Sequence, residues 1–171
     1  MRSTAARTYL RESGSKPSND TKKDFMRKCD LAQLTVKPFA GGGLVVAVAE
    51  DGQPRVIALG GAGRVGHGPT LTLYLSSAWD RLPDALTVNL LSPGQRLRPL
   101  HSPVVAGAAG DAGIRLEPGE SVRVQRIADA RMVFECRVLA QGSIQGLDGY
   151  SRVLVAEVLA AYQRWPRGCA I

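Results

Sequence analysis

Hydrophobic and polar residues alternate with a period of two along much of the chain after residue 35. In "PTLTLYLSS" (69–77), leucines occupy every second position from Leu71 to Leu75, and hydroxyl-bearing residues lie between them. Successive side chains of a strand point to opposite faces, so this pattern predicts a strand with one buried face. In "RMVFECRVLA" (131–140) the same alternation predicts a half-buried strand, with Cys136 as a buried structural thiol.

Further strands are predicted from apolar runs that end in turn residues. "GGLVVAVAEDGQPRVIALGG" (42–61) is typical of a hairpin with a tight turn at "EDGQP" (50–54). The others are "ALTVNLLSPG" (85–94), "ESVRVQRI" (120–127) and "RVLVAEVLAAY" (152–162). The last run is also compatible with a helix because it is continuously apolar, but its valines and the strand before it favour a strand. These short strands, without a strong long helix, predict a mainly β fold, a small antiparallel barrel.

The chain divides into two parts. Residues 1–33 are polar and charged, and we expect a basic flexible leader or a short helix there. The helix would begin after an N-cap at Thr21 and would carry Cys29 on its apolar face. Residues 34–171 form the barrel domain. Within it, residues 92–121 are rich in Pro, Gly and Ala and lack periodicity, so we expect a long loop or lid.

Composition and charge exclude several classes of function. The net charge is +7, but residues 1–30 contain eight Lys/Arg and four Asp/Glu, a net of +4, so the remaining chain carries only +3. Basic and aromatic residues are not interleaved, so we expect no nucleic-acid partner. No apolar run reaches the ~18 residues of a membrane span, so we expect no membrane partner. Cys29, Cys136 and Cys169 lack the spacing of a zinc site, and we expect no metal, free thiols and a cytoplasmic location.

Five segments follow one another in a particular order: "EDGQPRV" (50–56), "GPTLTLYLSS" (68–77), "LTVNLLSPGQ" (86–95), "DARMVFECRV" (129–138) and "VLVAEV" (153–158). This order resembles the flavin reductase-like, FMN-binding split-barrel family. The resemblance implies a split β-barrel, a homodimer with flavin at the subunit interface, and NAD(P)H-dependent reduction of flavin. FMN is the implied cofactor, with FAD as the alternative, and an oxygenase or other enzyme is the implied partner.

The resemblance also implies where the cofactor binds. The segment "GGAGRVGHGPT" (60–70) falls where the family has a loop that contacts flavin. Its glycine N–H groups can approach phosphate or ring oxygens closely, and Arg64 can add a charge-assisted contact. A plain turn between two strands is the alternative interpretation of the same residues.

Other candidates follow along the chain. Ser76 and Ser77 fall where the family binds phosphate, although serines after a strand also cap turns. Trp79 would stack on a ring or pack at the barrel rim. Asn89 would contact a ligand or bond backbone within the barrel. The candidate cofactor-binding residues are therefore Gly60, Gly61, Ala62, Gly63, Arg64, Ser76, Ser77, Trp79 and Asn89.

Two features of the family are missing, and they leave two functions open. The segment 60–70 has no Ser or Thr before Thr70, and the family's Asp-His pair falls on Tyr150 and Ser151, so no catalytic residue is assigned. One function is a flavin-binding, NAD(P)H-dependent reductase. The alternative is a divergent non-flavin split barrel that binds another small molecule or serves as a non-catalytic partner subunit of a larger enzyme.

The charged residues of the last strands are expected to lie at the surface. Glu135 and Arg137 are two positions apart, so they share a face, and we expect an exposed or interfacial pair. Glu157 is expected to point outward or to pair with Arg152.

Overall fold

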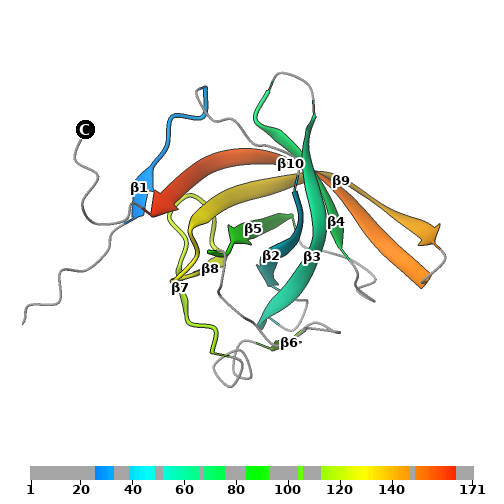
Figure 1. Ribbon diagram of the computed structural model, residues 1–171, viewed down its shortest axis with the longest axis horizontal. Coiled ribbons are helices and arrows are strands. Elements are labelled where there is room, and N and C mark those ends of the chain that lie inside the picture. The colour runs from blue at the N-terminus through cyan, green and yellow to red at the C-terminus, as the bar shows by residue number, and fades with distance from the viewer. Residues whose placement is uncertain are drawn as a thin grey trace, which may run out of the picture.

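The computed structural model describes residues 26–32, 39–48, 52–65, 68–75, 84–92, 104–105, 113–146 and 149–164. Figure 1 shows their strands: β1 (Met26–Lys28), β2 (Phe39–Val48), β3 (Pro54–Val65), β4 (Thr70–Leu75), β5 (Ala85–Leu90), β6 (Val104–Val105), β7 (Leu116–Pro118), β8 (Gln125–Ile127), β9 (Met132–Gly146) and β10 (Gly149–Arg164). These ranges contain no helix, and so none that would span a membrane. The mainly β class predicted from the sequence is confirmed.

Strands β2, β3, β4, β10, β9 and β5 close into an antiparallel barrel in that order. The ring is closed because β5 pairs with both β2 and β9, and β9 also pairs with β10. The β9–β10 ladder is irregular between Val155 and Ala156 and again between Val158 and Ala160. Irregularities of this kind bend a strand and increase its twist, which lets the two longest strands follow the wall of a small barrel. The predicted barrel is confirmed.

The β2–β3 hairpin forms where the turn residues predicted it. Val48 pairs with Pro54, and the connection contains Gly52 with a φ of 75°. This left-handed conformation is readily adopted by glycine. The continuous apolar run near the end of the chain is part of strand β10, so the strand interpretation is confirmed and the helix alternative is wrong.

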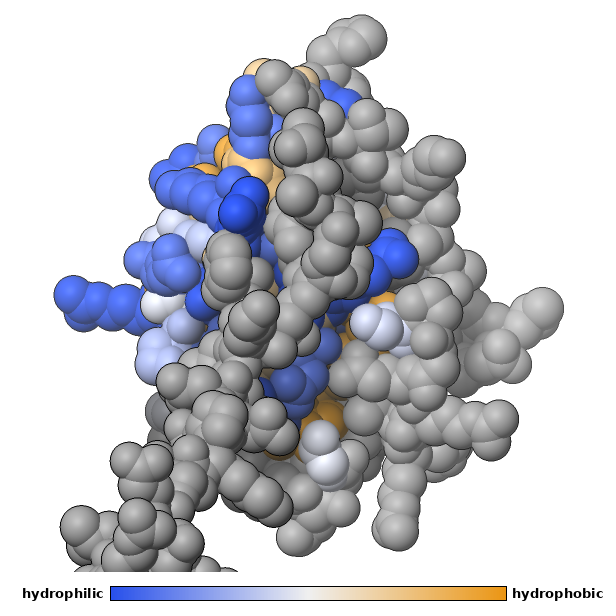
Figure 2. Space-filling view, turned by 60° about the vertical axis from the view of Figure 1, so that its left-hand side comes forward, coloured by the Kyte–Doolittle hydropathy of each residue, from blue (hydrophilic) through white to orange (hydrophobic). Residues whose placement is uncertain are grey.

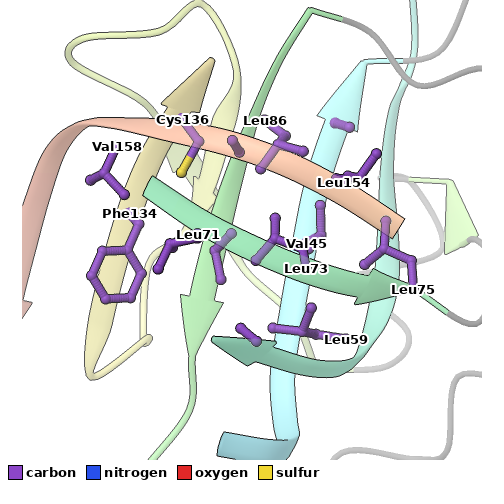
Figure 3. Close-up of a cluster of buried hydrophobic side chains, with 14 of the residues drawn as sticks. Val45, Leu59, Leu71, Leu73, Leu75, Leu86, Phe134, Cys136, Leu154 and Val158 are labelled. Carbon is purple, nitrogen blue, oxygen red and sulfur yellow. The ribbon is translucent and has the colours of Figure 1, made fainter. Parts of the chain in front are cut away.

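The barrel interior is a closely packed apolar core (Figure 3). The alternating leucines of β4 all point into it, and Leu73 has no exposed surface. Phe134 and Cys136 enter it from β9, so Cys136 is buried as expected. Burying a side chain such as Leu73 contributes about 1.5–3 kcal/mol. The period-two pattern therefore identified the inner face correctly.

A second apolar cluster lies outside the barrel wall, under residues 113–131, which we call the flap. The flap contains β7 and β8, which pair with each other. Val46 on β2, Val133 on β9 and Tyr162 on β10 pack against the flap's buried apolar residues, Ile114, Val122, Val124, Ile127 and Ala130. Among the residues coloured in Figure 2, hydrophilic ones predominate on the side turned forward, and the apolar areas between them are small. Where the flap covers it, the barrel wall therefore carries apolar residues on its outer face as well as on its inner face.

Several sequence-based expectations are wrong in their local structure. Residues 26–28 are not helical: they form β1, which pairs antiparallel with the end of β10. Residues 92–121 are not loop throughout, because they include β6 and β7. In the segment 120–127, only Gln125–Ile127 is a strand, although Val122 and Val124 are also buried.

The flap turn requires glycine at position 119. A Cβ built there would lie 2.8 Å from the carbonyl oxygen of Val122 and closer still to that of Val124. We expect Gly119→Ala to lower the free energy of unfolding by about 1–3 kcal/mol, because backbone must move to relieve the overlap. The control is Gly142→Ala, whose Cβ would meet nothing within 4 Å. Urea denaturation followed by circular dichroism measures both; equal stability of the two variants would contradict the steric argument.

Candidate functional site

The outer face of β3, β4 and β10 carries small, hydroxyl-bearing and apolar residues. In an antiparallel ladder, directly paired residues point to the same side of the sheet. Tyr74 pairs with Gly61 and Val153, and Thr72 pairs with Gly63 and Val155. We call the set Gly61, Gly63, Thr70, Thr72, Tyr74, Val153 and Val155 the outer face.

The outer face is open. The Tyr74 side chain is 47% exposed, whereas Leu73 and Leu75 beside it are fully buried on the inner face. A Cβ built at Gly63 would meet nothing within 4 Å. Glycines at 61 and 63 therefore leave the β3 backbone uncovered next to the hydroxyls of β4. Bare backbone, hydroxyl groups and two valines are suited to a flat ring system with polar edges. The residues present fit a flavin ring in this respect.

The structure divides the predicted site segment 60–64 between different surfaces. These residues are not a loop but the second half of β3, so the loop expectation is wrong for them. Gly61 and Gly63 lie on the outer face. Ala62 is 5% exposed and belongs to the barrel core, where it pairs with Leu73. Gly60 lies at the register irregularity, and a Cβ there would be 3.2 Å from the Tyr74 carbonyl oxygen.

Arg64 lies on the opposite side of β3 from the two outer-face glycines. It pairs with Leu71, which points into the barrel, yet Arg64 itself is exposed because it is near the end of the strand. Its Nε donates to the carbonyl of Gly68 at 3.2 Å. Arg64 and the outer-face glycines therefore lie on different sides of β3.

The remaining predicted residues lie elsewhere. Ser76, Ser77 and Trp79 lie outside the described residues. Asn89 is fully buried on β5, and its Nδ2 donates to the hydroxyl of Thr87 at 3.0 Å. Its Oδ1 accepts from the N–H of Ile127 at 2.8 Å. Asn89 thus ties the barrel wall to β8 of the flap, and its amide faces protein atoms rather than an open surface.

A charged pair marks one end of the outer face. Arg137 donates to Glu157 at 2.6 Å, and the two residues are direct cross-strand partners on β9 and β10. The expected surface pair of Glu135 with Arg137 is wrong, because Glu135 is fully buried. Glu157 points outward, which was one of the two arrangements expected for it. Such exposed pairs contribute little stability.

Glu135 is fully buried beneath the flap, which the sequence did not predict. Its Oε1 accepts from the N–H of Glu120 at 2.9 Å, and its Oε2 accepts from the N–H groups of Ser121 and Val122. Arg126 places Nη1 3.6 Å from Oε1. A buried carboxylate is tolerated where donors and a cation surround it. The carboxylate therefore fixes the flap turn onto the barrel wall.

Arg126 connects the flap to the barrel. It donates to Glu117 at 2.9 Å and to Glu120 at 3.1 Å, and its guanidinium lies 4.8 Å from the centre of the Tyr162 ring. Burial lowers the pKa of Arg126, but the hydrogen bonds and charges of Glu117 and Glu120 outweigh it and leave that pKa above the usual value. Burial also raises the pKa of Tyr162. Arg126 and Tyr162 therefore both keep their protons at neutral pH and serve in structure rather than in proton transfer.

The thiols and carboxylates of the described residues offer no metal centre or nucleophile. No group of three metal-ligating side chains occurs among them. Burial raises the pKa of Cys136 strongly, with a further contribution from the charge of Glu135. A thiol with a raised pKa is protonated and a poor nucleophile.

The alternation of residues in β4 predicts part of the outer face. Thr70, Thr72 and Tyr74 occupy the phase opposite the buried leucines, so a surface of hydroxyls follows from the period of two. Their position next to Gly61 and Gly63 depends on the β3–β4 register and was not visible in the sequence. The Glu135 site had no sequence signal, because its donors are backbone N–H groups of the flap.

Comparison with solved structures defines the class of fold. Nitrilotriacetate monooxygenase component B from Bacillus cereus has 12% identity and a TM-score of 0.56, covering 96% of this chain and 87% of its own. An FMN-binding domain of a flavin reductases-like enzyme from Shewanella baltica has 14% identity and a TM-score of 0.54, covering 82% and 78%. An NADH:FAD oxidoreductase from Streptomyces globisporus has 19% identity and a TM-score of 0.50, covering 77% and 73%.

These matches show that the chain has the split-barrel fold of flavin reductase-like proteins. No family model and no curated protein sequence matches it. The identities are low, so the likeness concerns the fold, which agrees with the resemblance seen in the sequence.

Proposed function

We propose that this protein binds FMN on its outer face and acts as an NAD(P)H-dependent, flavin reductase-like oxidoreductase. The observation that carries the proposal is the open strip of bare backbone at Gly61 and Gly63 beside the hydroxyls of β4. The split-barrel fold and the neighbours described as FMN-binding or as an NADH:FAD oxidoreductase support a flavin as the ligand. FAD is the alternative flavin.

When bound, the flavin ring supplies the hydride chemistry, and the chain's own residues hold it. Val153 and Val155 offer apolar contact to one side of the ring. Thr72 and Tyr74 can donate to its polar atoms from β4. Gly63 keeps the space above β3 free, because any larger side chain would extend into it. Ser76, Ser77 and Trp79 remain proposed cofactor contacts, as does Arg64 at the end of β3.

The proposal includes a homodimer and a partner enzyme. An open sheet face exposes one side of a ring to solvent, and a second subunit would cover that side and restrict water. The neighbour from Bacillus cereus is one component of a monooxygenase, which supports an oxygenase or other enzyme as the partner. We further propose a cytoplasmic location.

A divergent barrel without flavin is the second candidate function. It is favoured by the absence of a hydroxyl-bearing side chain on β3 between Gly60 and Val65. Such a barrel would bind another small molecule on the same face or act as a non-catalytic subunit of a larger enzyme.

Flavin binding is tested by titrating the purified protein with FMN and recording the absorption near ~450 nm that stays with the protein after gel filtration. We expect wild type to retain FMN, and we expect Thr72→Val and Gly63→Leu each to weaken binding about tenfold, equivalent to one lost contact or one steric conflict. The control is Arg131→Leu, because Arg131 is exposed at the last position of the flap and does not belong to the outer face.

Each outcome has a distinct meaning. If wild type retains FMN and only the two outer-face variants bind FMN more weakly, the proposed site is supported and an NADH oxidation assay follows. If wild type remains colourless, the non-flavin alternative replaces the proposal. If wild type binds FMN and both outer-face variants bind it equally well, the flavin lies on another surface.

A further inference from the structure

Three polar side chains form a row at one end of the outer face, the end farther from Tyr74. Glu157 on β10 pairs with Thr70 on β4 and with Arg137 on β9. Directly paired residues point to the same side of a sheet, so these three side chains all lie on the side of the barrel wall that carries the outer face. We call Thr70, Glu157 and Arg137 the polar row.

The backbone on both sides of the polar row is fixed by hydrogen bonds. The N–H of Val158 donates to the carbonyl of Pro69 at 2.6 Å, which holds β10 to the beginning of β4. The N–H of Val138 donates to the carbonyl of Asp84 at 2.8 Å, which holds β9 to the residue before β5. The order of the three residues across the sheet is therefore set by the pairing of the barrel strands.

Each side chain of the polar row keeps a polar group that bonds no other described residue. Both hydrogen bonds from Arg137, through Nε at 3.2 Å and Nη2 at 2.6 Å, go to Oε2 of Glu157. Within the described part of the chain, Oε1 of Glu157, Nη1 of Arg137 and the hydroxyl of Thr70 make no hydrogen bond. The side chains of Arg137 and Glu157 are 60% and 34% exposed, so a ligand can reach these groups.

The polar row presents a hydrogen-bond donor, an acceptor and a second donor in that order. The hydroxyl of Thr70 and the guanidinium of Arg137 donate, and the carboxylate of Glu157 between them accepts. An imide edge has the complementary order, because its N–H stands between two carbonyl oxygens. The pyrimidine end of a flavin ring carries such an edge, whereas the dimethylbenzene end carries no polar atom. The chemistry of the row therefore distinguishes one end of the ring from the other.

We infer that the polar row binds the imide edge of the flavin and that Glu157 accepts a hydrogen bond from the N–H of that edge. The inference rests on the proposed function and adds to it which end of the ring lies beside Thr70. An exposed ion pair such as that of Glu157 with Arg137 contributes little to stability. A hydrogen bond between a ligand and a charged group contributes more to binding than one between neutral groups. The pair thus serves recognition rather than folding.

The test titrates the full chain with FMN and with N3-methyl-FMN and follows the quenching of flavin fluorescence. In N3-methyl-FMN a methyl group replaces the imide hydrogen, so Glu157 has nothing to accept. We expect wild type to bind N3-methyl-FMN at least about tenfold more weakly than FMN, the loss of one hydrogen bond to a charged group. Glu157→Ala should bind FMN about tenfold more weakly than wild type does and should bind both flavins equally well.

Asp129→Ala is the matched control. Asp129 is also an exposed carboxylate paired with an arginine, Arg115, but it lies in the flap and not on the outer face. Its variant should bind FMN as wild type does and should keep the preference for FMN over N3-methyl-FMN. Glu157→Gln should recover part of the affinity lost in Glu157→Ala, because the amide oxygen still accepts.

A second probe, uridine monophosphate, separates the polar row from the flavin proposal, because uracil has the same imide edge without the flavin ring. If wild type binds both flavins equally well, or if Glu157→Ala keeps the preference for FMN, the inference is overturned and the flavin proposal stands. If wild type binds uridine monophosphate in a Glu157-dependent way but binds no flavin, the flavin proposal fails and the polar row is an imide site for a pyrimidine nucleotide. Binding of neither probe overturns both proposals.

Discussion

Replacement of Glu135 by alanine should lower the free energy of unfolding by about 3–5 kcal/mol, the usual cost of removing one partner from a buried charge pair. The carboxylate is fully buried and accepts from three consecutive backbone N–H groups of the flap. Without it, these donors and Arg126 would face an apolar wall. Chemical denaturation followed by tryptophan fluorescence or circular dichroism measures the loss.

Glu157→Ala provides a matched control. Glu157 is also a glutamate on a barrel strand paired with an arginine, but the pair with Arg137 lies at the surface. Its loss should cost less than about 1 kcal/mol. Glu135→Gln should fall between the two, because the amide oxygen keeps one acceptor while its NH₂ faces other donors. A Glu135→Ala variant as stable as Glu157→Ala would show that the flap holds to the barrel by apolar contact alone.

Deletion of residues 1–32 should lower the melting temperature by about 6–12 °C, because residues 26–32 are part of the folded barrel. β1 pairs with β10 at three positions, and the N–H of Cys29 donates to the carbonyl of Ala161 at 2.8 Å. Met26 packs against the flap cluster and Leu31 against the barrel core. Two such side chains at ~1.5 kcal/mol each account for about 3 kcal/mol.

Deletion of residues 1–25 separates this effect from that of the preceding sequence. It removes the earlier basic residues but keeps β1, so the difference between the two deletions reports on residues 26–32 alone. Differential scanning calorimetry of both proteins provides the comparison. Equal melting temperatures would show that β1 adds nothing to stability and that the segment is a simple leader.

The candidate site was only partly visible in the sequence. The position of β3 next to β4 places Gly63 beside Thr72, and this register depends on the whole closed barrel. The loop predicted over residues 60–70 is wrong for residues 60–65, because glycines usually signal turns, whereas here the strand continues to Val65. Gly61 is tolerated in that strand because β2 and β4 both pair with it, at Ala40 and Tyr74.

Glu135 shows where the period-two pattern of a strand fails to predict burial. A period of two correctly set Glu135 opposite Phe134 and Cys136, and a polar residue in that phase normally faces water. The flap covers this stretch of β9, so Val133 and Glu135 are buried as well. The outer side of a strand is exposed to solvent only if no second layer from elsewhere in the chain covers it. The sequence of the strand itself does not predict that cover.

The class of fold, the main barrel strands and their inner faces could be predicted from the sequence, because alternation and turn chemistry act over a few neighbouring residues. The neighbours of each strand, the pairing of residues 26–28 with the sheet and the position of Glu135 beneath the flap emerged only from the folded chain. The physical reason is that strand pairing and layer packing join residues far apart in the chain. Their free energy depends on closing the whole barrel rather than on any local pattern.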